Sequence, residues 1–440
     1  MILIYVPKLT NRVGYTLNLI FKTILHIPFE ITLDIDYYNS FEGYKLCYSK
    51  QKVGDGLYIK SIDLLYQTSI EDQDIHVTEY ENLPIFFATY GKDISLPFDI
   101  FAATFYLVSR YEEYLPHRKD KHHRFEYTNS IAFQHNFLHT PLVNKWADIL
   151  AKKIQEHYPL FTIPIRRFHY VNTIDIDAAY SFKGKGVFRS IGAFIRDLLK
   201  RDYQSLKIRL LVVMNIRKDP FDTFDYILSL AEKYHTELLF FVLFADYDNY
   251  DKNISHNNLH FQQLIKHLAD YSKVGIHPSY ASLDTPEKLT KEIKRLSHVL
   301  HKPIIRSRFH FLRFQLPESY KNLIKNGIEA DFSMGYSNQY GFRASICTPF
   351  NFYDLETDSE TNLMVHPFAI MDTALKIYMN YTADEALNTI KKIIDEIKSV
   401  EGSFYSLWHN SNLCNNDEWK DWTEVYEQML SYTNSLKVKQ

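Results

Sequence analysis

The chain has 440 residues, which at about 150 residues per domain suggests two or three domains, and two is the simplest expectation. Hydrophobic residues make up 46% and charged residues 23%, as in soluble globular proteins, which excludes wholesale disorder. With 50 basic and 53 acidic residues the formal net charge is −3, so no global field favours nucleic acid or an anionic membrane as a partner.

The start of the chain and the cysteines bear on the location of the protein. Residues 1–27 are partly apolar, but Pro7, Lys8 and Arg12 interrupt the continuous run that a signal peptide or a membrane span requires. The cysteines are far apart, odd in number and without Cys-x-x-Cys spacing, so neither a disulfide framework nor a zinc ribbon is indicated; they are Cys47, Cys347 and Cys414. We therefore expect a cytoplasmic protein without membrane insertion.

Residues 1–165 are expected to form a smaller α+β domain of unknown role. A strand is predicted at residues 1–6, and a helix follows in which apolar residues between positions 13 and 24 recur at helical spacing. After several short strand-like pieces, a second helix is predicted within residues 97–116, with a proline and an aspartate at its start.

A histidine-rich segment, HRKDKHHRFEY at residues 117–127, could be mistaken for a metal site. Its His122 and His123 are adjacent, so their side chains would point apart on a strand or on a helix. We therefore interpret the segment as a solvated loop.

Residues 166–440 alternate predicted strands and helices, which is typical of a mostly parallel sheet with crossover helices. One helix is expected to start with Pro286 in its first turn, and another with a capping box of Thr382 and Glu385. Seven such strands can close, so the expected fold class is α/β, with a distorted (β/α)7 barrel. The predicted strands are residues 169–177, 237–244, 273–280, 303–311, 329–336, 362–368 and 403–409.

Two carboxylates stand at the end of the first of these strands, where functional groups collect in such folds. Alternation along a strand places Asp175 and Asp177 on one face, about 7 Å apart along the chain. Unpaired carboxylates at that distance repel, and a metal ion or a shared proton would resolve the conflict. The pair is a candidate for one base and one metal ligand; the alternative is two strand-end caps that bond loop amides.

Other strand ends also carry groups suited to metal binding or proton transfer. His277 follows the third strand, where a buried core histidine is the alternative. Arg308 and His310 stand at alternate positions on the fourth, and an arginine can pair with a carboxylate through two hydrogen bonds. The sixth and seventh strands present His366 and His409. Their common location favours a shared site over separate packing roles.

The order of these motifs resembles that of the polysaccharide deacetylases of carbohydrate esterase family 4, over roughly residues 168–410. The resemblance is closest to bacterial members with an uncharacterised N-terminal domain. It implies that Asp175 is the catalytic base and that Asp177 is a metal ligand. The family has two histidines four residues apart after the third strand; His277 matches the first, but Ala281 stands at the second position.

The resemblance also implies the remaining roles. Arg308 matches the family's arginine on the fourth strand, and His310 is our expected replacement for the missing ligand. The catalytic acid maps onto His366 by strand order, while His409, one strand later, competes for the role. Two further residues could orient these groups or shape the pocket: Asp331 and Trp408.

The function implied by the resemblance is that of a metal-dependent hydrolase that removes acetyl groups from a carbohydrate, with N- and O-acetyl substrates both open. Zinc is the expected metal, because one or two imidazoles and a carboxylate with an open position are a donor set that suits it. It would polarise the acetyl carbonyl and lower the pKa of bound water. The expected partner is an acetylated carbohydrate, and no nucleic acid is expected.

Two other functions stay open. A non-catalytic carbohydrate-binding or assembly protein could have kept the barrel and lost the metal because of Ala281. A nucleotide-sugar glycosyltransferase could use Asp175-x-Asp177 to hold a metal–diphosphate complex, but no glycine-rich phosphate loop supports it. The segment KGKG at residues 183–186 lacks the spacing of such a loop, and we interpret it as a mobile rim loop.

Overall fold

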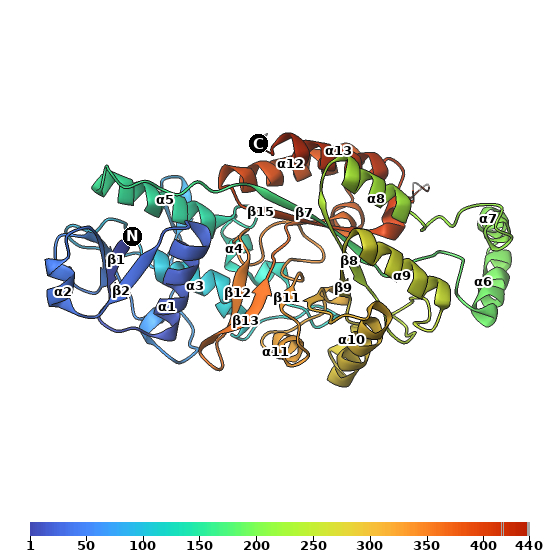
Figure 1. Ribbon diagram of the computed structural model, residues 1–440, viewed down its shortest axis with the longest axis horizontal. Coiled ribbons are helices and arrows are strands. Elements are labelled where there is room, and N and C mark those ends of the chain that lie inside the picture. Colours follow the sequence, from blue (N-terminus) through green and yellow to red (C-terminus); the bar gives the residue numbers. More distant parts are fainter. Residues whose placement is uncertain (415, 417, 438–440) are drawn as a thin grey trace.

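A four-stranded sheet and a nine-stranded sheet organise the chain (Figure 1), which the computed structural model describes at residues 1–414, 416 and 418–437. In spatial order the smaller sheet consists of β2 (Phe29–Thr32), β1 (Ile2–Tyr5), β3 (Tyr44–Ser49) and β4 (Leu57–Lys60). Its pairings are parallel, and helices α1 (Asn11–Leu17) and α2 (Ile35–Ser40) carry the chain back between the first three strands. This is an α/β arrangement, in contrast to the α+β arrangement expected for residues 1–165.

Two helices of the N-terminal part illustrate how side chains cap helix starts. The Thr10 hydroxyl accepts a hydrogen bond from the backbone N–H of Val13 in α1, and Asp99 caps α3 (Ile100–Val108) in the same way. Helix α3 is shorter than predicted, because Arg110 adopts a left-handed conformation with φ of 55°. The other elements here are the π-helix Asn18–Ile24, β5 (Thr78–Tyr80), β6 (Leu83–Ile85), α4 (Ile131–Gln134) and α5 (Leu142–His157).

The large sheet contains all seven strands predicted in residues 166–440, paired in parallel. Two strands that were not predicted extend it, one at each edge. In spatial order the sheet consists of β12 (Phe350–Asp354), β13 (Ser359–Val365), β11 (Ala330–Asp331), β10 (Arg306–Ser307), β9 (Lys273–Ile276), β8 (Glu237–Val242), β7 (His169–Ile176), β15 (Ser403–His409) and β14 (Ile370–Met371).

The large sheet stays open, whereas a barrel was expected. Within the described part of the chain its edges are β12 and β14, and no pairing joins them. Strand β12 folds back antiparallel on β13 and so occupies the edge that closure would need. The N-terminal part covers this hairpin: the Tyr15 hydroxyl donates to the Asn351 carbonyl oxygen (2.8 Å), and Arg12 pairs with Asp358 (2.7 Å). The edge is thereby protected from pairing with other chains.

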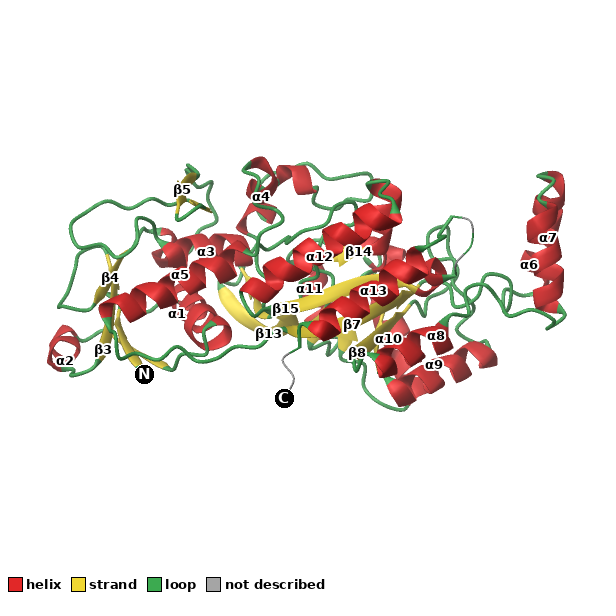
Figure 2. Cartoon of the chain, turned by 90° about the horizontal axis from the view of Figure 1, so that it is seen from above, coloured by secondary structure: helices red, strands yellow, loops and turns green. Residues whose placement is uncertain are grey.

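Helices alternate with the strands of the large sheet (Figure 1). The predicted starts of two of them are confirmed, with Pro286 in the first turn of one and both bonds of the Thr382–Glu385 capping box in another. The helices are α8 (Phe224–Lys233), α9 (Leu259–Tyr271), α10 (Pro286–Leu300), α11 (Glu318–Lys325), α12 (Ala383–Ser399) and α13 (Trp422–Ser435). A further pair, α6 (Val187–Leu199) and α7 (Tyr203–Val213), projects away from the sheet (Figure 2).

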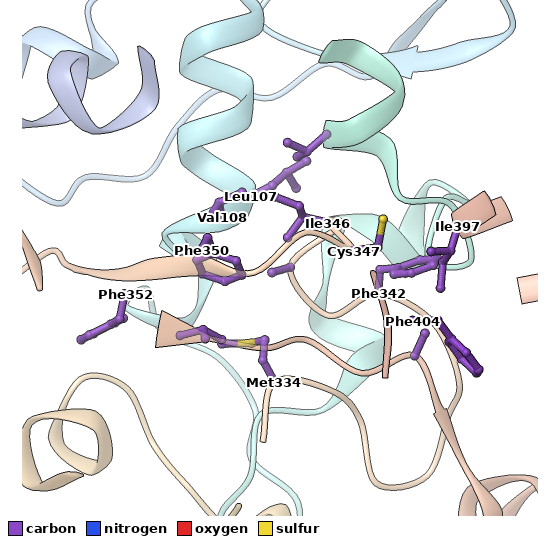
Figure 3. Packing of buried hydrophobic residues seen from close by; sticks show 14 of the residues in the cluster. Leu107, Val108, Met334, Phe342, Ile346, Cys347, Phe350, Phe352, Ile397 and Phe404 are labelled. Carbon is purple, nitrogen blue, oxygen red and sulfur yellow. The ribbon is translucent and has the colours of Figure 1, made fainter. Parts of the chain in front are cut away.

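The N-terminal part and the large sheet share one hydrophobic core. Figure 3 shows Leu107 and Val108 of α3 in the buried cluster that also contains Ile346 and Phe350, next to and within β12. Residues before and after position 165 therefore pack into a common core. The domain boundary at residue 165 stays a prediction.

Candidate functional site

Six of the seven predicted site residues meet at one edge of the large sheet. Parallel strands end at the same edge, so the loops that follow β7, β9, β10 and β15 lie together there. In the strand register, His409 is opposite Asp175 on the neighbouring strand. The residues brought together are Asp175, Asp177, His277, Arg308, His310 and His409.

Three of these side chains offer ligand atoms to a common point. One carboxylate oxygen of Asp177 and one ring nitrogen each of His277 and His310 lie within 4.8 Å of one another. The Nε2 of His277 is 3.2 Å from Asp177 Oδ1, and the Nε2 of His310 is 3.6 Å from Asp177 Oδ2. His310 thus brings to the cluster a second imidazole, which Ala281 cannot supply.

The second ring nitrogen of each histidine is held by an acceptor outside the cluster. Nδ1 of His277 bonds to the carbonyl oxygen of Arg308, and Nδ1 of His310 lies 2.9 Å from Asp251 Oδ1. A carbonyl or carboxylate oxygen only accepts, so Nδ1 carries a proton in both rings and Nε2 is the atom turned toward Asp177. Metal-binding histidines are oriented by such outer partners.

The cluster fits a divalent cation. Asp177 Oδ1 is buried, and although His277 Nε2 is nearby, the geometry is not that of a hydrogen bond, so this oxygen has no donor among the described residues. Burial raises the pKa of Asp177, but His310, His277 and His409 outweigh it and hold the pKa well below its usual range. Burial lowers the pKa of His310, but Asp177 and Asp251 raise it to about 9. Two imidazoles and a carboxylate with open positions are a donor set that zinc accepts.

Asp175 is the second carboxylate, and it is 2% exposed. Its Oδ1 accepts a hydrogen bond from Arg308 Nη1 (2.9 Å), and its Oδ2 is 3.7 Å from His277 Nε2. Arg308 is itself fixed, because its Nε donates to the Phe332 carbonyl oxygen (3.0 Å) and its guanidinium lies over the Phe241 ring. The ion pair therefore orients Asp175 and leaves Oδ2 free beside the cluster.

His409 ends β15 on the other side of Asp177. Its Nδ1 donates to Asp372 Oδ1 (2.8 Å), and Asp372 Oδ2 also accepts from the backbone N–H of His409 and from Asn412. Its Nε2 lies 3.8 Å from Asp177 Oδ2. Burial lowers the pKa of His409, but Asp372, Asp177 and Asp175 raise it to about 10. His409 is therefore protonated at neutral pH.

His366, which strand order suggested as the catalytic acid, lies apart from this group. Its ring stacks on Phe332 with 4.3 Å between centroids, and its Nδ1 bonds to the Tyr405 hydroxyl (2.8 Å). Burial, with Arg306 nearby, lowers its pKa to about 3, so at neutral pH the ring is neutral and is not an imidazolium acid. The assignment by strand order does not fit this position.

Asp331 and Trp408 have structural contacts and do not line the pocket. Asp331 accepts hydrogen bonds from the Tyr320 hydroxyl and from Ser333. Trp408 packs against Tyr426 and another tryptophan of α13, because alternation along β15 turns its neighbours toward the pocket and Trp408 away from it.

The pocket that contains the cluster is partly walled by the N-terminal part. Arg124 lines it, and its guanidinium bonds to the carbonyl oxygen of Phe311 (2.7 Å). His122 is also buried, with Nδ1 3.0 Å from the Tyr280 hydroxyl. The segment 117–127, expected to be a solvated loop, is therefore in part a buried contact with the loop that carries His310. Apolar residues complete the wall: Phe309, Phe311, Leu312, Met371, Tyr378 and Leu407.

Sequence reasoning missed three residues of this site: Asp251, Asp372 and Arg124. Asp251 lies in a loop and Asp372 directly follows β14 at the start of a helical segment, and each acts through a histidine that is distant along the chain. A search for an acidic partner of each candidate histidine would have shown that such partners were needed, but no signal in the sequence selects Asp251 and Asp372.

The N-terminal part matches a protein-family model. Residues 2–159 match a family of unknown function (DUF7033). This is consistent with the uncharacterised N-terminal part that the resemblance implied. No curated protein matches the chain.

Solved structures similar to this chain include two assigned as polysaccharide deacetylases. The protein from Mycobacterium smegmatis is 13% identical with a TM-score of 0.41, over 63% of this chain and 87% of its own. The protein from Pseudomonas aeruginosa is 10% identical with a TM-score of 0.38, over 61% and 86%. An allantoinase is 11% identical with a TM-score of 0.40, over 61% of this chain and 85% of its own. Because these identities and TM-scores are low, nothing about the activity of this chain follows from them.

Proposed function

We propose that the protein is a metal-dependent hydrolase that removes acetyl groups from a carbohydrate, either from nitrogen or from oxygen. The observation that carries this proposal is the placement of two proton-handling groups beside one cluster of ligand atoms. Asp175 lies beside His277, and His409 lies beside Asp177. A base and an acid beside a cation site are the groups that hydrolysis of an amide or an ester requires.

Asp177, His277 and His310 are the residues that would hold the cation, and zinc is the metal that their donor types favour. When bound there, a divalent cation would polarise the acetyl carbonyl and make a nearby water easier to deprotonate. Asp251 and the Arg308 carbonyl would keep the two imidazoles aimed at it.

Asp175 and His409 each have one atom that is held by a neighbour and one that is available for proton transfer. Arg308 occupies Oδ1 of Asp175, so Oδ2 is the atom that takes the proton from the attacking water. Asp372 holds Nδ1 of His409, so the Nε2 proton is the one delivered to the departing amine or alkoxide. The raised pKa of His409 keeps that proton in place at neutral pH.

The pocket wall supports an acetyl substrate. Leu312, Met371 and Leu407 offer apolar surface to a methyl group within the same pocket as the acid and the base. The carbohydrate part of the proposal rests on the resemblance in motif order, and the choice between N- and O-acetyl groups is left to experiment.

Two measurements test the proposal. Elemental analysis of the purified protein should find about one zinc per chain, and acetate should be released from at least one member of a panel of acetylated oligosaccharides. Chelation should stop acetate release and added zinc should restore it. Binding of an oligosaccharide without bound metal and without acetate release would instead favour the non-catalytic alternative.

A further inference from the structure

Helices α6 and α7 form a hairpin, residues 187–217, that stands apart from the rest of the molecule in both views (Figures 1 and 2). The hairpin leaves the sheet after β7, in the loop that follows Asp177. The two chain segments at its base are tied together, because the Asp219 carboxylate accepts hydrogen bonds from the backbone N–H groups of residues 181–183 (2.7–3.1 Å). The projection is therefore attached beside the candidate site.

Both helices of the hairpin and the residues after α7 expose large apolar side chains. In α6, spacings of three and four residues place Ile191, Ile195, Leu198 and Leu199 on one face. Between 50% and 79% of each side chain is exposed in Ile191, Ile195, Leu198, Leu199, Tyr203, Leu210, Val213, Met214 and Ile216. A soluble surface rarely concentrates so many large apolar side chains, and such a concentration is typical of a surface that binds a partner.

The same hairpin is basic, although the whole chain has a net charge of −3. Between residues 190 and 217 the acidic side chains are Asp197, which pairs with Arg209, and Asp202, which caps α7. Four exposed cations form no ion pair with any described residue: Lys200, Arg201, Lys207 and Arg217. The local charge is thus opposite in sign to that of the chain.

We propose that the α6–α7 hairpin docks on an anionic lipid surface. Exposed apolar side chains together with unpaired Lys and Arg are the features of helices that lie in the plane of a membrane interface. A second copy of this chain fits less well, because it would bring the same cations against these cations. No described helix is long and apolar enough to cross a bilayer. Docking in the interface needs no such helix.

This docking would place the candidate site close to substrates held at the membrane. The hairpin begins at Val187, in the segment that follows Asp177, so docking would hold the chain that carries the candidate site at the membrane. The proposal does not depend on the chemistry of the site, since lipid binding is measured separately from acetate release.

Sedimentation of the full-length protein with vesicles tests the proposal. We expect binding to vesicles of phosphatidylcholine and phosphatidylglycerol, little binding to phosphatidylcholine alone, and release of the protein by high salt. Each Lys or Arg near such a surface contributes about fivefold to partitioning, so Lys200→Glu with Arg201→Glu should weaken binding by about 25-fold or more. Ile195→Ser with Leu199→Ser should also weaken it, because apolar burial is lost.

Matched variants outside the hairpin provide the control. Leu160→Ser with Ile165→Ser removes two side chains that are 89% and 88% exposed, and Lys302→Glu with Lys325→Glu reverses two exposed cations. Both should bind vesicles like the unchanged protein, and circular dichroism should show every variant folded. Equal binding to neutral and anionic vesicles, or equal loss in the control variants, would overturn the proposal. So would a dimer in sedimentation velocity that the Ile195→Ser and Leu199→Ser changes convert to monomer, because the face would then be a self-association surface.

Discussion

At the scale of single residues, the candidate site depends on which atom each side chain leaves free. Arg308 bonds to Oδ1 of Asp175, and Asp372 bonds to Nδ1 of His409. Each of these bonds leaves the other atom of the reacting group to face the cluster. Two carboxylates that differ by two positions in the chain thereby acquire different surroundings: Asp175 is paired with a guanidinium, and Asp177 with imidazoles.

The two carboxylates should respond differently to the same substitution. Asp175→Asn should retain zinc and lose about 10²–10⁴-fold in turnover, because an amide does not accept the proton of water. Asp177→Asn should lose zinc and activity together, since an amide oxygen is a poorer ligand than a carboxylate. Zinc content and acetate release on the same preparations distinguish the two. Near-normal turnover in Asp175→Asn would show that the roles are wrongly assigned.

The two candidate acids can be separated in the same way. His409→Ala should lower turnover by about 10²–10⁴-fold with zinc retained, because the leaving group then receives no proton from the protein. His366→Ala is the matched control and should keep nearly full turnover, since His366 does not line the pocket. A large loss of turnover in folded, zinc-loaded His366→Ala would contradict the choice of His409.

At the scale of elements, the loop after β10 is held by the N-terminal part. Phe311 and Leu312 both have positive φ (59° and 51°), a conformation that costs non-glycine residues energy and persists where neighbours enforce it. Arg124 bonds to the Phe311 carbonyl, and Arg313 donates to the His122 carbonyl (3.2 Å). The contact therefore helps to position His310, which directly precedes this turn.

Loss of the Arg124 contact should weaken metal binding without removing a ligand. In Arg124→Ala the loop is free to leave its left-handed turn, and we expect zinc affinity to fall by about 10–100-fold, as for other outer partners of metal ligands. Competition with a chromophoric chelator measures the affinity. Arg118→Ala changes an exposed arginine of the same segment and should leave the affinity unchanged. Equal affinities in all three proteins would show that the segment does not position His310.

At the scale of the whole molecule, a buried ion pair joins the N-terminal part to the segment between β11 and β12 of the large sheet. Arg343 donates to Glu113 through two nitrogens (2.9 and 2.6 Å), and Arg110 donates to the same carboxylate (2.8 Å). Burial by itself raises the pKa of Glu113, but Arg343 and Arg110 lower it to about 2. This carboxylate therefore stabilises the fold while it is ionised.

The stabilisation by Glu113 should depend on pH. A carboxyl group whose pKa falls from about 4.5 unfolded to about 2 folded contributes about 3 kcal/mol above pH 4.5, and the contribution is lost as pH falls toward 2. Glu113→Gln should therefore lower the urea midpoint at pH 7, with a difference that narrows in acid. The exposed Glu42→Gln should change little at any pH. A pH-independent difference for Glu113→Gln would show that ionisation of the pair is not the cause.

Local patterns in the sequence determined the elements and the strand ends of this protein. Alternation placed Asp175 and Asp177 at one strand end, and capping residues marked the starts of helices such as α12, because these features depend on neighbours within a few residues. The seven strands of the large sheet were predictable for the same reason, and so was the edge at which His277 and His409 would lie.

Only the tertiary structure decided how these elements are joined and which atoms meet. Strand β12 and the N-terminal part hold the sheet open. Asp251 and Arg124 reach the site from loops, and Asp372 from the end of an edge strand that was not predicted. His366 was favoured by strand order, but its ring packs on Phe332 and Tyr405 away from the pocket. The reason is physical: a local pattern records the period of a helix or strand, whereas long-range pairs form between groups whose separation along the chain carries no information about their distance in space.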